Sequence, residues 1–356
     1  MRAKGKLVLI VLVTVALVFM ASCSGGSSQA AASAAGDGKK AYKIAFSNSY
    51  VGNAWRTGCV NIFNAYTSRL VREGILSKAY CSSAGDDVQA QINEIRNMMS
   101  EGYDAIVTIA ASATGLNSVL EEAADRGIVI VAFDAQIDSD KVYNVNTDQV
   151  EFGRLLADWL VKEMGGKGNI LWIKGIEGTA ITNMRTEGMN NVLKNYPDIK
   201  VLGEGFGKWD LSTSAEVMAN LMSAHASKGI NGVLCEGGGG HSIVESLREY
   251  KYDVTKIPIS EGEFFNAFMK DWVELGLNAF ATAQPPYLVA AAVDIALRVL
   301  NGETVDKMTL IPTPTCSSQQ EAQEKWYQPT QEGGFLCDYT DNDNTWKLTI
   351  AEVAPK

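Results

Sequence analysis

The stretch AIVTIAASATGLNSVLEEAADRGIVIVAFD, residues 105–134, decides the fold. It begins with one apolar run, 105–109, and ends with a second, 128–133, which is followed directly by Asp134. Between the two runs, residues 114–124 carry apolar side chains at helical spacing. Short, continuously apolar strands suit a sheet that is buried on both faces, and a helix between them indicates a right-handed βαβ unit with parallel strands.

The same alternation extends to both sides of this stretch. The predicted strands are 42–46, 77–81, 105–109, 128–133, 169–173, 200–205, 232–235, 257–260 and 280–284. The predicted helices are 88–99, 114–124, 152–164, 184–193, 214–222 and 288–299. Strands that alternate with helices predict an α/β fold with parallel sheets. So many strands exceed what one compact unit holds, which predicts two lobes.

The N-terminus reads as an export signal. Basic residues precede the uncharged run 7–20, and small residues lead to Cys23. The run is shorter than the roughly 20 apolar residues that span a membrane. The order Met20-Ala21-Ser22-Cys23 resembles a bacterial lipobox, so we expect a signal peptide over 1–22 and a lipid on Cys23. Residues 23–41 would then be a flexible tether. The alternative is a plain secretory signal with an incidental cysteine.

The composition excludes some classes of protein. The chain has 356 residues, 46% of them hydrophobic and 20% charged, as in ordinary globular proteins. Its net charge is −10 and its pI is near 4.9. A nucleic-acid-binding protein shows the opposite sign and a basic patch, so we expect no nucleic-acid partner.

Five cysteines follow Cys23, and export would place them where disulfides persist. Because the number is odd, one stays free, and Cys235 at the end of an apolar run is the expected one. The others pair most simply as neighbours, Cys59 with Cys81 and Cys316 with Cys337. The second pair would staple the tail after Asn301, where Pro and Gly replace regular periodicity.

Signatures of catalysis, metal binding and cofactor binding are scarce. The only histidines are His225 and His241. The run 236–240, EGGGG, lacks the Lys-Ser/Thr of a phosphate-binding loop and is better explained as a mobile loop beside a pocket. We therefore expect no metal site, no cofactor and no enzymatic activity.

Polar side chains recur where the predicted strands end, which is where ligands bind in open α/β sheets. They include Arg56, Thr179, Thr182 and Glu263. The candidate ligand-binding residues are Asn48, Asn53, Trp55, Asp134, Asn183, Arg185, Glu236, Glu261 and Gln284. Carboxylate, amide and guanidinium groups match paired hydroxyls, and an aromatic face covers the C–H side of a sugar ring. This inventory predicts a site for a polyol.

Over residues 42–303 the chain resembles the type I, ribose/galactose class of periplasmic sugar-binding proteins. The resemblance rests on four segments: KIAFS at 43–47 with Trp55, GIVIVAFD at 127–134, GIEGT at 175–179 with RTEG at 185–188, and AQPP at 283–286. Two departures weigh against a pentose. Ala135 stands where the family often has Arg, and the family's Arg at the helix start falls on Asn183.

The resemblance implies roles for several residues. Trp55 would stack on the sugar, with Asn53 a nearby polar contact, and Asp134 would take paired hydroxyls. Gln284 would lie at a hinge crossing. Glu236 and Glu261 stand where the family usually has Asn and Asp.

The family fold implies two Rossmann-like lobes with a ligand cleft between them, joined by three crossings. We expect these crossings near 146, 284 and 311. The first lobe would comprise 42–146 with 285–310, and the second 147–284 with 311–356. DNA-binding repressors share this fold, but they begin with a helix-turn-helix instead of an export signal.

The expected function is therefore capture of a monosaccharide or related polyol outside the cytoplasm. The protein would be a lipid-anchored monomer that delivers its ligand to the permease of an ABC importer. A nucleoside, an autoinducer or another small polar ligand feeding a sensor is the alternative within the binding class. A glycosidase that uses Glu236 and Glu261 as its carboxylate pair is the alternative within the enzyme class.

Overall fold

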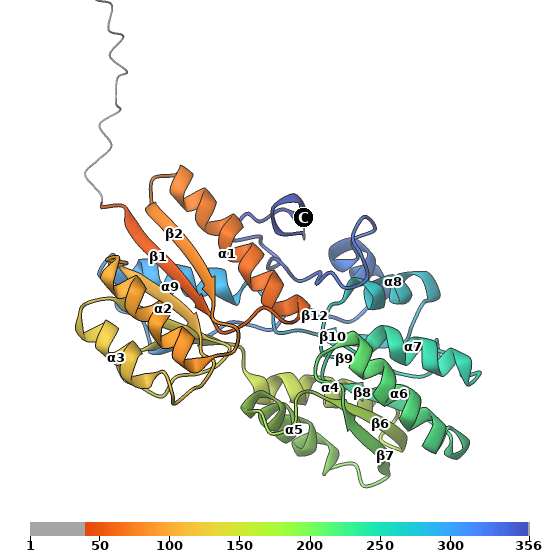
Figure 1. The fold of residues 1–356 in the computed structure, drawn as a ribbon. Coiled ribbons are helices and arrows are strands. Elements are labelled where there is room, and N and C mark those ends of the chain that lie inside the picture. The colour runs from red at the N-terminus through yellow and green to blue at the C-terminus, as the bar shows by residue number, and fades with distance from the viewer. Residues whose placement is uncertain (1–39, 355–356) are drawn as a thin grey trace, which may run out of the picture. The chain divides into compact units, whose positions relative to one another are not determined.

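The computed structural model describes residues 40–354, which form two six-stranded α/β lobes (Figure 1). This confirms the predicted fold class. The signal peptide predicted over 1–22, the lipid site at Cys23 and the tether up to residue 39 lie outside the described residues.

Lobe 1 contains the sheet with strand order β11-β5-β4-β3-β1-β2. Its strands are β1 (Tyr42–Asn48), β2 (Leu76–Ser83), β3 (Ala105–Ile109), β4 (Val129–Phe133), β5 (Tyr143–Asn146) and β11 (Met308–Leu310). Its helices are α1 (Ala54–Arg72), α2 (Val88–Ser100), α3 (Asn117–Asp125) and α9 (Leu288–Leu300). Side chains alternate across the sheet: Ile44 and Phe46 pack in the core with α1 and α9, whereas Ala45 packs with α2 and α3.

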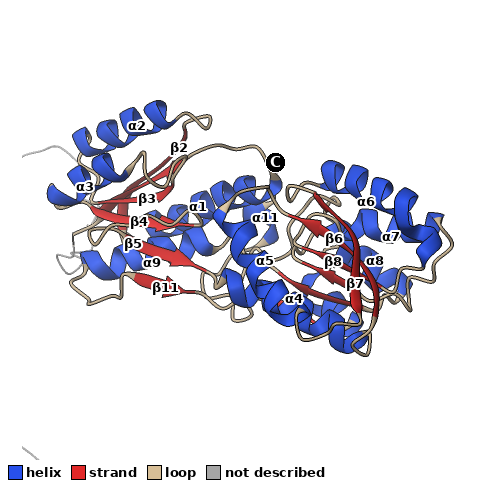
Figure 2. Cartoon of the chain, turned by 90° about the horizontal axis from the view of Figure 1, so that it is seen from below, coloured by secondary structure: helices blue, strands red, loops and turns tan. Residues whose placement is uncertain are grey.

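Lobe 2 contains the sheet with strand order β12-β10-β9-β8-β6-β7, in which only β12 runs antiparallel to its neighbour. Its strands are β6 (Gly168–Lys174), β7 (Ile199–Phe206), β8 (Gly232–Cys235), β9 (Ile259–Glu261), β10 (Ala279–Thr282) and β12 (Thr315–Cys316). Its larger helices are α4 (Gln149–Glu163), α5 (Ala180–Leu193), α6 (Leu211–His225), α7 (Gly240–Glu249) and α8 (Asn266–Leu275). Helices cover both faces of each sheet (Figure 2).

All nine predicted strands are present, and β5, β11 and β12 were not predicted. Each of these three is four residues or shorter. Such short strands show no periodicity in a sequence, and their pairing depends on neighbours that are distant along the chain. Both β5 and β11 end where the chain leaves lobe 1.

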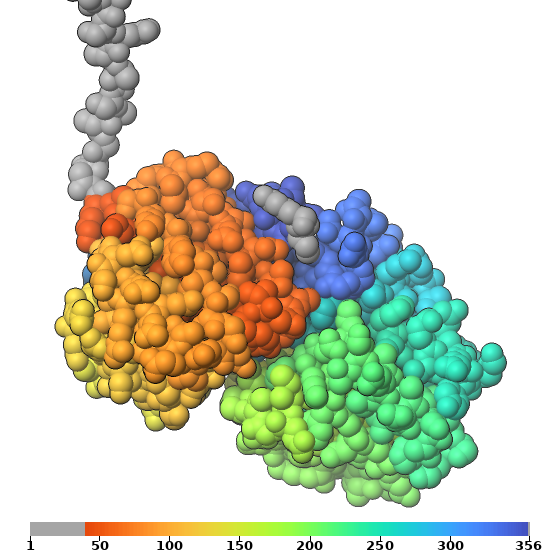
Figure 3. All heavy atoms as spheres, viewed as in Figure 1, coloured from red at the N-terminus to blue at the C-terminus, as the bar shows by residue number. Residues whose placement is uncertain are grey.

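The chain passes between the sheets at 147–148, 283–287 and 311–314. The tail, residues 317–354, then contacts both lobes. Its first part packs on lobe 2, where the rings of Phe264 and Trp326 lie 4.6 Å apart. Its last part packs on lobe 1, where Asn61 Nδ2 donates to the Val353 carbonyl at 2.9 Å. Figure 3 shows this segment beside α1.

The prediction that 311–356 belongs to the second lobe is therefore wrong for the end of the chain. Trp346 contacts groups of the hinge and of lobe 1: its Nε1 donates to Asp294 of α9 at 2.6 Å, and its ring lies 5.0 Å from that of Tyr287. The sequence of the tail does not show this, because the tail has no apolar periodicity that assigns it to one sheet.

Two glycines set the closest helix contact in lobe 2. A Cβ at Gly153 of α4 would lie 2.0 Å from the Arg185 carbonyl, and one at Gly188 of α5 would lie 2.0 Å from the Val150 carbonyl. Because these positions lack a Cβ, the backbones of α4 and α5 touch there. This contact fixes the part of α5 that carries Arg185.

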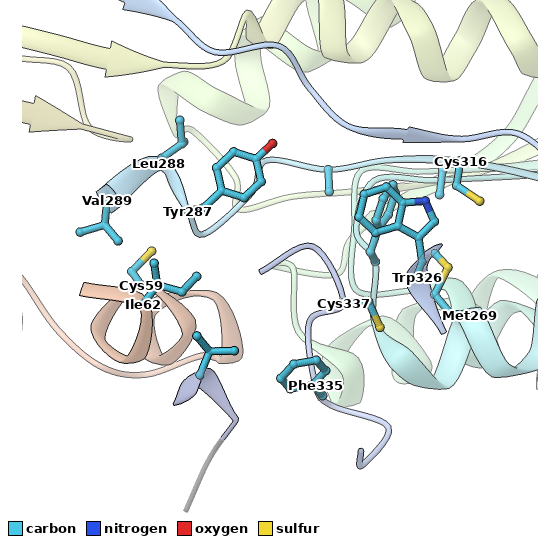
Figure 4. Close-up of a cluster of buried hydrophobic side chains, with 14 of the residues drawn as sticks. Cys59, Ile62, Met269, Tyr287, Leu288, Val289, Cys316, Trp326, Phe335 and Cys337 are labelled. Atoms are coloured by element: carbon cyan, nitrogen blue, oxygen red, sulfur yellow. The ribbon is translucent and has the colours of Figure 1, made fainter. Parts of the chain in front are cut away.

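The predicted disulfides are absent. Cys59, Cys81, Cys235, Cys316 and Cys337 are all free thiols, as was predicted only for Cys235. In the view of Figure 4 the side chains of Trp326 and Met269 separate the sulfur atoms of Cys316 and Cys337. The prediction paired neighbours along the chain, but here cysteine serves as a small apolar residue of the core.

Candidate ligand-binding site

A cavity of about 830 Å³ lies between the two lobes. Its polar and aromatic lining residues are Tyr50, Asn53, Trp55, Arg56, Asp86, Asp134, Gln136, Asp138, Ser139, Asn144, Thr179, Arg185, Trp209, Glu263, Phe265, Gln284 and Lys307. Both lobes and the second crossing contribute. This is the edge at which the parallel strands of both sheets end, as the strand-end argument requires.

Five of the nine predicted site residues line this cavity: Asn53, Trp55, Asp134, Arg185 and Gln284. Asn53 also begins α1, because its side chain accepts a hydrogen bond from the Arg56 backbone N–H at 2.9 Å. The other four residues are Asn48, Asn183, Glu236 and Glu261, and they lie outside the cavity lining.

Each of these four has a different local reason for its position. Asn48 is fully buried and accepts from Arg56 Nη1 at 3.2 Å, so it supports a cavity residue from behind. Asn183 points away from the cavity on the exposed side of α5. Glu236 is fully buried and accepts from the Gly175 N–H at 3.0 Å and from Thr186 Oγ1 at 3.2 Å. Glu261 is buried behind the cavity wall.

A chain of hydrogen bonds, the central network, joins the lobes along the cavity. Its members are Arg56, Asp134, Gln284, Gln149 and Arg185. Arg56 Nη2 donates to Asp134 Oδ2 at 3.1 Å, and Gln284 Nε2 donates to Asp134 Oδ1 at 2.7 Å. Gln149 Nε2 donates to Gln284 Oε1, and Arg185 Nε donates to Gln149 Oε1 at 2.9 Å. The network thus runs from α1 through the second crossing to α4 and α5.

Asp134 holds an unusual backbone conformation at the end of β4. Its φ is +63°, which is left-handed and uncommon for a residue with a side chain. The Asn146 amide donates to its carbonyl at 2.9 Å and holds this turn. Strained residues that the surrounding structure fixes in this way cluster at binding sites.

Arg185 is almost completely buried, with 2% of its surface exposed. Its Nη1 donates to the Glu236 carbonyl at 2.9 Å, and its guanidinium carbon lies 3.7 Å from the centre of the Phe152 ring. Burial lowers the pKa of Arg185, an effect that the carboxylates of Glu263 and Glu236 partly counter. These contacts hold a cation at the lobe 2 wall of the cavity.

Two tryptophans line the cavity from opposite lobes. Trp55 of α1 donates its indole N–H to the Gln284 carbonyl at 2.7 Å. Trp209 lies in the loop between β7 and α6, and its indole N–H is buried without a partner among residues 40–354. The sequence does not point to Trp209, because the strand before it, 200–205, is only weakly apolar.

The glycine run 237–240 follows β8 and is buried, and its mobility stays a prediction. A Cβ at Gly237 would lie 2.5 Å from Glu263 Cγ, and one at Gly238 would lie 2.7 Å from the Trp209 carbonyl carbon. Both glycines have positive φ, +132° and +78°. The run allows Glu263 and Trp209 to approach the cavity from behind, which is why larger residues are absent there.

The geometry disfavours the enzymatic alternative. The carboxylates of Glu236 and Glu261 do not line the cavity, and the protein itself hydrogen-bonds both oxygens of Glu236. A carboxylate pair that hydrolyses a glycoside must flank the scissile bond. Within residues 40–354, no group of three or more His, Cys, Asp or Glu side chains is arranged to hold a metal ion.

Residues 44–304 match the model of the periplasmic binding protein domain family. The chain belongs to this family. The family consists of binding proteins rather than enzymes. None of the helices in the described part is both long and apolar enough to cross a membrane.

Two curated relatives and one solved structure show how far the likeness extends. A xylitol-binding protein of Mycolicibacterium smegmatis is 30% identical over 200 residues, 56% of this chain and 54% of that protein. The galactofuranose-binding protein YtfQ of Escherichia coli is 31% identical over 186 residues, 51% of this chain and 57% of that protein. The chain thus spans about half the length of these curated relatives.

The crystal structure of an ABC transporter solute binding protein from Thermobispora bispora superposes with a TM-score of 0.71 at 21% identity. The match covers 83% of this chain and 90% of that one. At this identity the likeness supports the type I periplasmic binding protein fold, with two parallel-sheet lobes.

Proposed function

We propose that this chain captures an uncharged monosaccharide or related polyol between its lobes, outside the cytoplasm, and delivers it to the permease of an ABC importer. Family membership supports capture and delivery by a binding protein. Two relatives, a xylitol-binding protein and a galactofuranose-binding protein, support a polyol as the ligand.

The observation that carries the proposal is the central network, with a tryptophan from each lobe beside it. A guanidinium has five N–H groups. Those of Arg185 have three acceptors, the Gln149 side chain, the Glu236 carbonyl and the Gln284 side chain, which leaves two for a ligand. Trp55 and Trp209 supply aromatic surface for the apolar face of a sugar ring. A polyol requires both hydrogen-bonding groups for its hydroxyls and an aromatic surface for its C–H face.

One wall of the cavity favours a second candidate. Ile176, Ile181 and Met184 form an apolar surface at the lobe 2 side. A nucleoside has both a ribose for the central network and a planar base for such a surface. Nucleosides therefore belong in the same test.

The test is a thermal-shift panel on the mature protein, with pentoses, hexoses, alditols, inositols and nucleosides. We expect at least one uncharged sugar or polyol to raise the melting temperature, because a ligand that binds only the folded state stabilises it. Delivery is then tested by uptake of the same compound in cells that lack the protein. Stabilisation by nucleosides alone would assign the site to the second candidate, and indifference to the whole panel would contradict both.

We further propose that a lipid on Cys23 anchors the protein to the membrane, as the lipobox-like order at 20–23 suggests. Cys23→Ser should release the protein into the soluble fraction and abolish incorporation of a labelled fatty acid. The matched control is Ser22→Ala, which keeps a small residue before the cysteine. If the Cys23→Ser protein still sediments with membranes and still carries label, the anchor lies elsewhere.

A further inference from the structure

A buried carboxyl group of lobe 2 faces the cavity without a partner. Glu263 follows β9, lines the cavity and is 7% exposed. Its Oε2 has no hydrogen-bond partner among the described residues. The close approach of Gly237 to Glu263 Cγ limits how far this side chain can turn. Because Oε2 is shut off from the cavity, a ligand would meet this carboxyl group at its other oxygen, Oε1. A carboxyl group left unsatisfied beside a binding site points to a group that the ligand supplies.

Two more unpartnered carboxyl groups are buried nearby. Glu261 lies on β9 and Asp338 on the tail, and none of their four carboxyl oxygens has a hydrogen-bond partner among residues 40–354. The Gly238–Gly240 backbone and the Cys235 thiol face Glu261, yet they do not reach hydrogen-bond geometry with its oxygens. We call Glu261, Glu263 and Asp338 the acid cluster.

Among residues 40–354, no cation forms an ion pair with the acid cluster. The nearest is Arg185, three of whose N–H groups donate to neutral oxygens and whose charge only partly counters the rise in the pKa of Glu263. Asp134 faces Glu263 from lobe 1, but the Asp134 carboxylate is already paired with Arg56. Glu236 faces Arg185 and is satisfied by the Gly175 N–H and the Thr186 hydroxyl.

Unpaired charges in such a site are costly, so a buried carboxyl group takes up a proton instead. Burial raises the pKa of Glu261 to about 8 and that of Asp338 to about 7. Burial, and then the Asp338 carboxylate, hold the pKa of Glu263 well above its usual range.

We propose that Glu263 is a specificity residue that is protonated in the ligand-bound protein and donates a hydrogen bond to an uncharged oxygen of the ligand. This rests on the proposed function and deepens it, because it makes the ligand a neutral polyol and, above the folded pKa of Glu263, couples its binding to proton uptake. A ligand that carries a protonated amine would offer N–H donors where Glu263 needs an acceptor.

The first measurement needs no ligand. A carboxyl group whose pKa is raised by folding contributes stability below its unfolded pKa near 4.5 and loses it as the pH rises through the folded value. The melting temperature of the wild-type protein should therefore fall between pH 5 and pH 9. Glu263→Gln should show a smaller fall, and Glu187→Gln, an exposed position on α5, should behave as the wild type. An equal fall in all three proteins would overturn the protonation of Glu263.

The second measurement is calorimetric titration with xylitol, D-galactose and D-galactosamine at pH 6 and pH 9. Above the folded pKa of Glu263, the wild-type affinity for a neutral probe should fall by up to about tenfold per pH unit. Glu263→Gln should bind more weakly at pH 6 and show nearly the same affinity at both pH values. Equal pH dependence in the variant, or tighter binding of galactosamine than of galactose, would overturn this inference alone. If no neutral probe binds, the proposed function fails with it.

Discussion

Asp134→Ala is expected to weaken binding of the sugar or polyol found by the panel by about 30- to 1,000-fold, which corresponds to about 2–4 kcal/mol. The change removes a carboxylate that both Arg56 and Gln284 hydrogen-bond. It leaves the Arg56 guanidinium, whose side chain is 13% exposed, without its charged partner at the cavity wall. It also opens the central network at its lobe 1 end.

Calorimetric titration checks this result, with circular dichroism to show that the variant is folded. Asp134→Asn is the conservative variant, since it retains an oxygen that can accept from Gln284 while it removes the charge. Asp140→Ala is the matched control, because Asp140 follows the same strand but is exposed. If Asp134→Ala binds within threefold of the wild type, Asp134 is not a ligand-binding residue.

Trp346→Ala is expected to lower the free energy of unfolding by about 3–5 kcal/mol, the usual cost of removing a large buried aromatic side chain. Trp346 is 6% exposed and packs on Tyr287 of the second crossing. Its indole N–H is one of two donors that satisfy the Asp294 carboxylate, and Tyr66 supplies the other. The loss therefore combines a cavity with a weakened buried polar pair.

Urea unfolding of the full mature chain measures this effect. Trp346→Phe keeps a ring against Tyr287 but loses the hydrogen bond, so it should cost about 1–3 kcal/mol. Tyr250→Ala, at a position that is 41% exposed, should change stability by no more than about 0.5 kcal/mol. A Trp346→Ala protein as stable as this control would show that the tail does not stabilise lobe 1.

The sequence predicts the strands well where they are buried on both faces. The run 128–133 shows why: in a protein of this composition, a short continuous run of apolar residues indicates a strand that is buried on both faces. The short strands β5, β11 and β12 form because neighbouring strands are already in place. The tail is the other exception, because its contacts with α1 and α9 depend on a few separated residues, among them the Trp346 side chain and the Val353 carbonyl.

For the site, the sequence predicts the edge of the sheet but not the direction of each side chain. Asp134 and Gln284 lie in the cavity, whereas Glu236 follows an equivalent strand and turns inward to the Gly175 N–H. Whether a strand-end carboxylate faces a ligand or the backbone depends on which donors the neighbouring loop presents. Trp209 is the converse case. It lines the cavity, but the strand before it is only weakly apolar, so the sequence gives little reason to place it at a strand end.

The central claim is that the cavity between the lobes binds an uncharged sugar or polyol. Its most direct test is calorimetric titration of the mature protein with the compound that the panel selects, beside the Asp134→Ala and Asp140→Ala variants. We predict one binding site per chain for an uncharged sugar or polyol, strongly weakened by Asp134→Ala and unchanged by Asp140→Ala. Saturable binding of the same compound that is equally strong in the wild type and in Asp134→Ala would contradict the claim.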